Sequence, residues 1–147
     1  MQNNNPKPTI KNIEIGKFYF IHDGSKTGHP GLIVWKDDLN NLYIAIKFGS
    51  TANSHNFPLG RAVGKGIKQS FIYKRAFLGK RKDYSGAVLN DMSVSKEDYK
   101  MILNKVDLIN LISSKNINRK DKRYIKKLMS NKKSPFQGQL SGCETRI

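Results

Sequence analysis

Three short runs of apolar and aromatic residues within the first fifty positions constrain the fold most strongly. They occupy residues 17–23 (KFYFIHD), 30–36 (PGLIVWK) and 42–48 (LYIAIKF), and turn-forming residues separate them. Runs of this length with β-branched and aromatic side chains predict β-strands. Because the connections between them are too short for a crossover, the three strands are expected to form an antiparallel meander.

The remainder of the chain changes from strand-like to helical periodicity. Residues 67–77 (IKQSFIYKRAF) alternate again, and residues 84–89 (YSGAVL) predict a short final strand. Ser95 begins a helical pattern, since Asp98 follows three residues later in a capping arrangement. A second helix is predicted over residues 118–129. The first helix is expected to present one apolar face, made of Tyr99, Ile102, Leu103, Val106 and Ile109.

Strands followed by helices predict an α+β fold, and short strands of this number favour a closed architecture. We expect a small SH3-like β-barrel of about five to seven antiparallel strands with the C-terminal helices packed on it. The length of 147 residues suits one domain. We place a flexible arm at 1–12, a single barrel-plus-helices domain at 13–130 and a disordered basic tail at 131–147. The long polar segment at 49–66 is of a kind that often carries function.

The charge of the chain narrows the class of partner. Lys and Arg number 27 against 11 Asp and Glu, which gives a formal net charge of +16. Such an excess attracts nucleic acid, an anionic membrane face or an acidic protein. A coding bias toward lysine contributes, but the same bias favours glutamate, which is scarce here.

Several classes of protein are disfavoured by what the sequence contains. The single cysteine, Cys143, cannot form an internal disulfide, which fits a reducing, cytoplasmic setting. Three scattered histidines lack metal-ligand spacing, so neither a metal nor a cofactor is expected. The segment GRAVGKGIKQS at 60–70 fails as a phosphate-binding P-loop, because its spacing is wrong and Gly66 follows the lysine. The polar N-terminus is no signal peptide, and no apolar stretch is long enough to span a bilayer, so no membrane association is expected.

The order of the motifs resembles the MazF/PemK superfamily of toxin–antitoxin ribonucleases, including its ToxN-like branch. Gly16–Tyr19 is similar to the start of the first strand of that family, and Gly28-His29-Pro30 to the motif that precedes its next apolar strand. Ser50-Thr51 matches the polar end of the following strand, and Ser85–Tyr99 is similar to the segment that enters the last helix. The resemblance covers residues 16–110.

This resemblance implies a toxin that cleaves single-stranded RNA without metal, by attack of the 2′-hydroxyl on its own phosphate. A base must take the 2′ proton, an acid must protonate the leaving oxygen, and donors must stabilise the charged phosphorus centre. The implied catalytic residues are His29, Ser50 and Thr51. His29 stands where the family has an arginine, so the missing positive charge is expected from His29 itself, Lys26, Lys47 or Arg61.

Other basic and aromatic residues are expected to hold the RNA strand. Phe57 and Tyr73 are the best candidates for stacking on bases, because basic loop residues surround them in sequence. The resemblance also implies a cognate antitoxin, which is either an RNA or an acidic protein, and a homodimer or a toxin–antitoxin hetero-oligomer. The RNA-binding residues are predicted to be Lys26, Lys47, His55, Arg61, Lys65, Tyr73 and Arg75.

Each of these residues also fits a structural role. A histidine before a proline is a common turn residue, Ser50 and Thr51 are ordinary turn formers, and a run of lysines is often a solvated face. Two other functions therefore stay open. One is a non-catalytic nucleic-acid-binding barrel of a plasmid or phage, and the other is a basic protein that recognises an acidic partner through its C-terminal helices.

Overall fold

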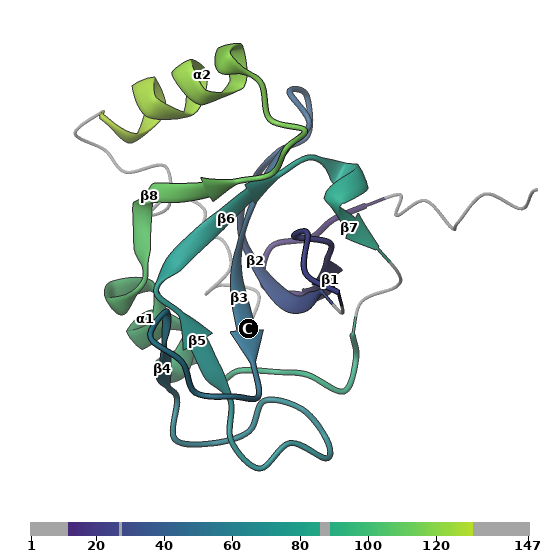
Figure 1. Cartoon of the computed structure of the whole chain (residues 1–147), viewed down its shortest axis with the longest axis vertical. Helices are drawn as coiled ribbons and strands as arrows, with labels where there is room; N and C mark the ends of the chain where they lie inside the picture. The colour runs from purple at the N-terminus through teal and green to yellow at the C-terminus, as the bar shows by residue number, and fades with distance from the viewer. Residues whose placement is uncertain (1–11, 27, 86–88, 131–147) are drawn as a thin grey trace, which may run out of the picture.

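The computed structural model describes residues 12–26, 28–85 and 89–130 (Figure 1). Three predicted parts of the chain lie outside the described residues. They are residues 1–11 of the arm, the tail at 131–147 and residues 86–88 of the strand predicted at 84–89. The elements are β1 (Phe18–Ile21), β2 (His29–Asp37), β3 (Leu42–Gly49), β4 (Asn56–Pro58), β5 (Phe71–Tyr73), β6 (Arg75–Gly79), the short 3₁₀ helix η1 (Arg81–Asp83), β7 (Tyr84–Ser85), α1 (Lys96–Lys105), β8 (Asp107–Ser113) and α2 (Arg119–Met129).

The fold is α+β, and its eight strands form one mostly antiparallel sheet in the order β4-β5-β3-β2-β1-β7. A branch leaves this path at β3, where β6 pairs, and β6 pairs in turn with β8, the parallel pair of the sheet. The predicted barrel does not close, because the pairing path of the described strands ends at β4 and β7. β3 pairs with β6 along Tyr43–Ala45 and with β5 at Phe48 and Gly49. The sheet therefore splits into two arms at β3.

The core lies on both faces of β3, whose residues 42–48 are all buried. The odd-numbered side chains of Tyr43 and Ala45 belong to one cluster with Tyr19, Phe77 and Tyr84. The even-numbered side chains belong to a larger cluster that also contains Tyr99 and Ile102 of α1 and Ile125 of α2 (its β3 members are Leu42, Ile44, Ile46 and Phe48). Because strand side chains alternate, Lys47 falls on the face of Tyr43 and Ala45, and its side chain is buried.

Two predictions about the C-terminal half are confirmed at the level of single residues. The Ser95 hydroxyl accepts a hydrogen bond from the Asp98 backbone N–H at 3.1 Å and caps α1. The second helix begins after Asn118, whose side chain accepts from the Asp121 N–H at 2.8 Å.

Two other predictions are wrong. The run at 67–77 is not one strand, because β5 ends at Tyr73 and β6 begins at Arg75. The first helix ends at Lys105, and the chain then forms β8 along the edge of β6. Ile109, predicted on the helical face, is therefore a strand residue with 70% of its surface exposed. The segment Asp107–Ser113 is rich in Leu and Ile, which suit a strand wherever an unpaired strand edge is available.

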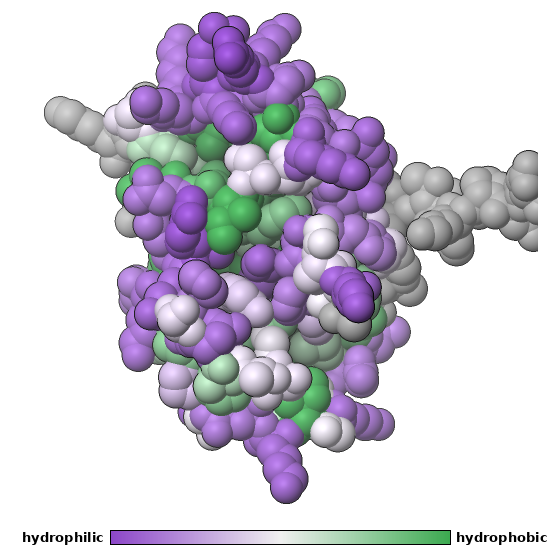
Figure 2. Space-filling model, viewed as in Figure 1, coloured by the Kyte–Doolittle hydropathy of each residue, from purple (hydrophilic) through white to green (hydrophobic). Residues whose placement is uncertain are grey.

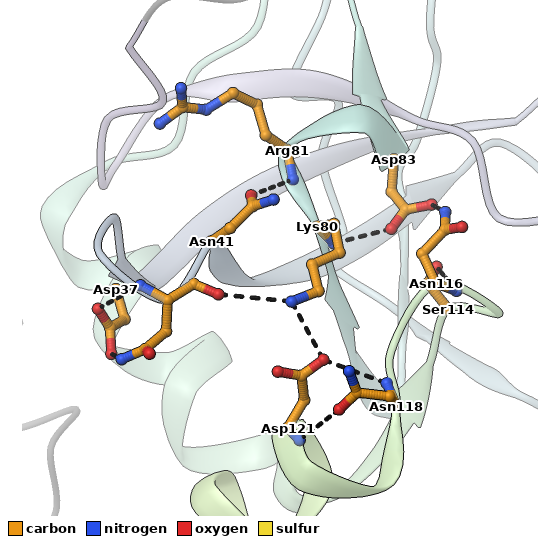
Figure 3. Close-up of polar contacts among 10 residues, drawn as sticks. Asp37, Asn41, Lys80, Arg81, Asp83, Ser114, Asn116, Asn118 and Asp121 are labelled. Carbon is orange, nitrogen blue, oxygen red and sulfur yellow. Dashed lines mark hydrogen bonds and ion pairs between the residues drawn. The ribbon is translucent and has the colours of Figure 1, made fainter.

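A polar network fixes the entry of α2 to the corner between β6 and β7 (Figure 3). The buried carboxylate of Asp83 accepts from the Lys80 backbone N–H and from the Asn116 amide, both at 2.7 Å. The ammonium of Lys80 forms an ion pair with Asp121 at 3.1 Å, in the first turn of α2. In the part of the chain that the structure describes, no helix is long and apolar enough to cross a membrane.

Candidate functional site

Four side chains from separate segments meet where β2 begins and β3 ends. The antiparallel register pairs Gly31 with Lys47, so His29 at the start of β2 lies beside the last residues of β3. β5 pairs with the same end of β3, which brings in Tyr73. Asp23 comes from the turn between β1 and β2. We call Asp23, His29, Lys47 and Tyr73 the His29 cluster.

Hydrogen bonds join the members of the His29 cluster in a chain. The Asp23 Oδ2 atom lies 2.7 Å from His29 Nδ1 and accepts from Lys47 Nζ at 3.1 Å. The Tyr73 hydroxyl lies 3.1 Å from His29 Nε2. The Lys47 ammonium also lies 4.7 Å from the centroid of the Tyr73 ring. One carboxylate thus serves an imidazole and an ammonium, and the imidazole connects it to a phenol.

The positions of the protons in this series of hydrogen bonds follow from the ionisation of Asp23. Burial acts to raise the pKa of Asp23, but hydrogen bonds from the Ser25 hydroxyl and N–H and from Lys47 outweigh it and hold that pKa well below its usual range. An ionised carboxylate only accepts hydrogen bonds, so His29 Nδ1 carries a proton. In the neutral imidazole, Nε2 is then the acceptor and the Tyr73 hydroxyl donates to it. The arrangement orients one histidine nitrogen for proton transfer.

The cluster borders a pocket of about 350 Å³, which we call the basic pocket. Lys47 and Tyr73 contribute from the His29 cluster, and Lys74 and Arg75 add two further cations. No Asp or Glu is among its lining residues, which are Lys47, Ser54, His55, Tyr73, Lys74, Arg75 and Ile112. A pocket with three cations, a phenol and an imidazole suits an anion such as a phosphate group.

The structure brings together five of the residues predicted from the sequence. His29, Lys47 and Tyr73 are in the cluster, and His55 and Arg75 line the basic pocket. Arg75 also has a structural task, because its guanidinium donates to the backbone carbonyls of Asn110 and Leu111 on β8, at 2.7 Å and 3.3 Å.

Phe57 lines a neighbouring pocket together with Lys74 and Arg75, and the other five predicted residues lie apart from the cluster. Ser50 and Thr51 are exposed just beyond β3, and within the described residues neither hydroxyl makes a hydrogen bond. Arg61, within the long polar segment at 49–66, pairs with Asp98 of α1 at 3.5 Å. Lys26 and Lys65 are exposed turn residues.

Sequence reasoning missed Asp23 and Lys74 as site residues. Asp23 was interpreted as a turn former in DGSKTG. The signal that was available is a carboxylate six residues before a histidine, across a turn that starts a strand. Lys74 was attributed to a solvated face, but it separates β5 from β6 at the rim of the basic pocket.

A different hollow, of about 520 Å³, lies between β8 and α2 and shares only Arg75 with the predicted site (its apolar members include Leu78, Ile109, Leu111, Ile125 and Met129). In Figure 2 hydrophilic side chains cover α2 at the top of the view, and hydrophobic side chains are exposed just beneath it. Among residues 12–26, 28–85 and 89–130, no three His, Cys, Asp or Glu side chains gather as a group that could hold a metal ion.

Comparisons with protein-family models, with curated proteins and with solved structures find no match to this chain.

Proposed function

We propose that this protein is a metal-independent endoribonuclease that cleaves single-stranded RNA, and that it is the toxin of a toxin–antitoxin pair. The observation that carries the proposal is the chain Asp23–His29–Tyr73, which ends at a pocket lined by cations and by no carboxylate. A carboxylate that orients a histidine is the usual support for acid–base chemistry. A cationic pocket beside it is suited to a phosphodiester.

The reaction needs two proton transfers. The 2′-hydroxyl loses its proton to a base, its oxygen bonds to phosphorus, and the bond to the 5′-oxygen breaks as an acid protonates that oxygen. His29 Nε2 is the proposed base. Because the Tyr73 hydroxyl is hydrogen-bonded to Nε2 in this structure, the proton reaches Nε2 either through that hydroxyl or after the RNA has displaced it. His55 lines the same pocket and is the proposed acid. The products are a 2′,3′-cyclic phosphate and a 5′-hydroxyl.

Cations supply the electrostatic part of the mechanism. Preorganised donors aimed at the phosphorus centre stabilise the extra charge of the transition state. Lys47 stands on the wall of the pocket and Lys74 on its rim, so they take the role that an arginine has in the resembling family. Ser50 and Thr51 are exposed beyond the end of β3 and are proposed to donate to the RNA backbone.

The remaining features of the proposal follow from the same resemblance. The split sheet is proposed to be an opened relative of the small SH3-like barrel, and the protein is proposed to act in the cytoplasm. Its antitoxin, an RNA or an acidic protein, would cover the basic pocket. The net charge of +16 is compatible with both kinds of antitoxin.

One observation favours a second function. Both ring nitrogens of His29 are hydrogen-bonded, to Asp23 and to Tyr73, as in a histidine with a purely structural role. A non-catalytic barrel that binds nucleic acid would use the basic pocket and leave the strand intact.

Cleavage of matched RNA and DNA strands separates these two functions. The purified protein is incubated with single-stranded RNA and with DNA of the same sequence, both in excess EDTA. The nuclease proposal predicts that RNA is cut and DNA is not, because DNA lacks the 2′-hydroxyl. Binding of both strands with no cleavage of either would establish the second function instead.

A further inference from the structure

A second pocket adjoins the basic pocket and differs from it in chemistry. It has a volume of about 680 Å³, and its lining residues are Phe57, Pro58, Lys74, Arg75, Lys105 and Asp107. They come from β4, the β5–β6 junction, the end of α1 and the start of β8. The labels α1, β4 and β5 stand close together at the lower left of Figure 1. Lys74 and Arg75 line both pockets, so the two pockets are neighbours and one extended ligand can occupy both. We call it the Phe57 pocket.

The carboxylate of Asp107 distinguishes the Phe57 pocket from the basic pocket, which has no acidic lining residue. Hydrogen bonds from the backbone N–H groups of Asn110 and Ile109 lower the pKa of Asp107, so the group is ionised at neutral pH. Its Oδ1 accepts both of those N–H groups, and among the described residues its Oδ2 accepts from the Asn110 amide alone, at 3.0 Å. A position on Oδ2 remains for a further donor. The Phe57 pocket therefore offers a carboxylate acceptor to an N–H group of a ligand.

Phe57 supplies an aromatic surface in the same pocket. Its ring is half-buried and packs on the larger core cluster, which fixes its orientation. The exposed ammonium of Lys105 lies 5.7 Å from the ring centroid, and Pro58 adds a further apolar surface. An aromatic ring bordered by cations is the usual platform on which a base of a single strand stacks.

We propose that the Phe57 pocket binds a nucleobase of the RNA strand whose phosphate occupies the basic pocket, with the base stacked on Phe57 and its N–H groups directed to Asp107. The inference rests on the proposed nucleic-acid function and adds a determinant of sequence preference to it. Lys74 and Arg75 stand between the base and the phosphate. Bases with an exocyclic amino group fit Asp107 better than uracil does, because each presents an additional donor.

The test measures binding without cleavage. The ligands are a 2′-O-methyl oligocytidine, which lacks the reactive hydroxyl, and inorganic polyphosphate, which has charge but no bases. Phe57→Leu should weaken oligocytidine binding about tenfold, the usual size of one lost stacking contact, and leave polyphosphate binding unchanged. Equal weakening of both ligands, or of neither, would overturn the proposal. The matched control is Phe71→Leu, since Phe71 is a half-buried aromatic residue on the neighbouring strand outside the pocket.

A second variant guards against a folding defect in Phe57→Leu. Phe57→Trp places a fluorophore in the pocket, whereas the native Trp35 is buried in the core. Its emission should be quenched by oligocytidine and not by polyphosphate, and quenching by both or by neither contradicts base stacking. Because no cleavage is measured, an inactive protein that shows this base-dependent response would refute the nuclease proposal alone. An active nuclease without the response would refute only the Phe57 pocket.

Discussion

The carboxylate of Asp23 accepts hydrogen bonds from an ammonium and an imidazole at once. Its Oδ2 atom accepts from the Lys47 ammonium and from the imidazole of His29, while Ser25 satisfies Oδ1. The side chains of Asp23 and Lys47 are only 5% and 9% exposed, so neither charge has much access to water. Loss of one partner from such a buried pair leaves the other uncompensated. Asp23 is thus expected to support both the fold and the orientation of His29.

A double-mutant comparison of Asp23 and Lys47 tests this coupling. Asp23→Asn should lower the free energy of unfolding by about 3 kcal/mol, because it leaves a buried ammonium without a counter-charge. Adding Lys47→Met should restore about 1 kcal/mol or more, since the uncompensated charge is removed. Urea unfolding measures both values. Asp38→Asn is the control, because that exposed carboxylate pairs at the surface and should cost less than about 1 kcal/mol. A double variant no more stable than Asp23→Asn would contradict the coupling.

The depressed pKa of Asp23 predicts how stability depends on pH. The folded-state pKa lies below the unfolded value, which is near 3.9, so the carboxylate contributes stability that is fully present above that value. This contribution is lost as the pH falls toward the folded-state pKa. Between about pH 5 and about pH 2.5 the wild type should lose more free energy of unfolding than the Asp23→Asn/Lys47→Met variant. Parallel pH dependences of the two proteins in urea unfolding would show that Asp23 is not stabilised in this way.

The sequence predicted part of this cluster for a physical reason. His29 and Lys47 stand at ends of strands that the alternating pattern located, and antiparallel pairing brings such ends together. Asp23 was not predicted, because its partners depend on the path of a turn and not on periodicity. Arg61 was predicted as a site residue from its charge alone, and the structure pairs it with Asp98 of α1.

Elements were predicted well where one periodicity dominated and poorly where two competed. The meander β1–β3 and helix α2 follow the sequence pattern closely. The segment after Lys105 has apolar residues that fit a helix and a strand alike. Whether it forms a helix or a strand depends on the unpaired edge of β6, and no local sequence pattern reveals that edge. That strand matters to the site, because Asp107 and Ile112 line its two pockets.

The position of α2 depends on a polar network that can be tested by one substitution. Asp83→Asn places an amide donor where the Lys80 N–H and the Asn116 amide both donate, so one donor loses its acceptor in a buried site. The free energy of unfolding should fall by about 2 kcal/mol. Asp91→Asn is the control, because Asp91 is an exposed carboxylate in a turn outside this network, and it should change the free energy of unfolding by less than about 0.5 kcal/mol. Equal costs for the two variants in urea unfolding would mean that burial of Asp83 adds nothing.

At the scale of the molecule, the excess of positive charge attracts any polyanion. The two pockets are where we propose that a nucleic-acid strand binds. Basic residues cover α2 as well as the rim of the basic pocket (on α2 they are Arg119, Lys120, Lys122, Arg123, Lys126 and Lys127). The basic pocket adjoins the His29 cluster, because Lys47 and Tyr73 belong to both. A strand bound for cleavage must therefore depend more on Lys74 than on the lysines of α2.

The salt dependence of binding tests this location. Each phosphate neutralised on a single strand contributes about −0.7 to the slope of log K against log salt. Lys74→Ala should reduce the magnitude of the slope for a 2′-O-methyl oligocytidine by about 0.7. The exposed Lys120 of α2 provides the control, and Lys120→Ala should leave the slope unchanged. Binding is measured by fluorescence anisotropy at several KCl concentrations. A larger change of slope for Lys120→Ala than for Lys74→Ala would show that the RNA binds on α2.

The most direct test of the central claim is the chemistry of the RNA ends. Wild type, His29→Asn and His22→Asn are incubated with RNA in EDTA, and the 3′ ends of the products are analysed. Asparagine keeps a donor toward Asp23 but cannot transfer protons, and His22 is an exposed histidine bonded to Ser85 outside the cluster. We expect 2′,3′-cyclic phosphate ends from wild type and His22→Asn, and a rate lower by about 10²-fold or more for His29→Asn. Uncut RNA with wild type, or equal rates for His29→Asn and wild type, would contradict the account.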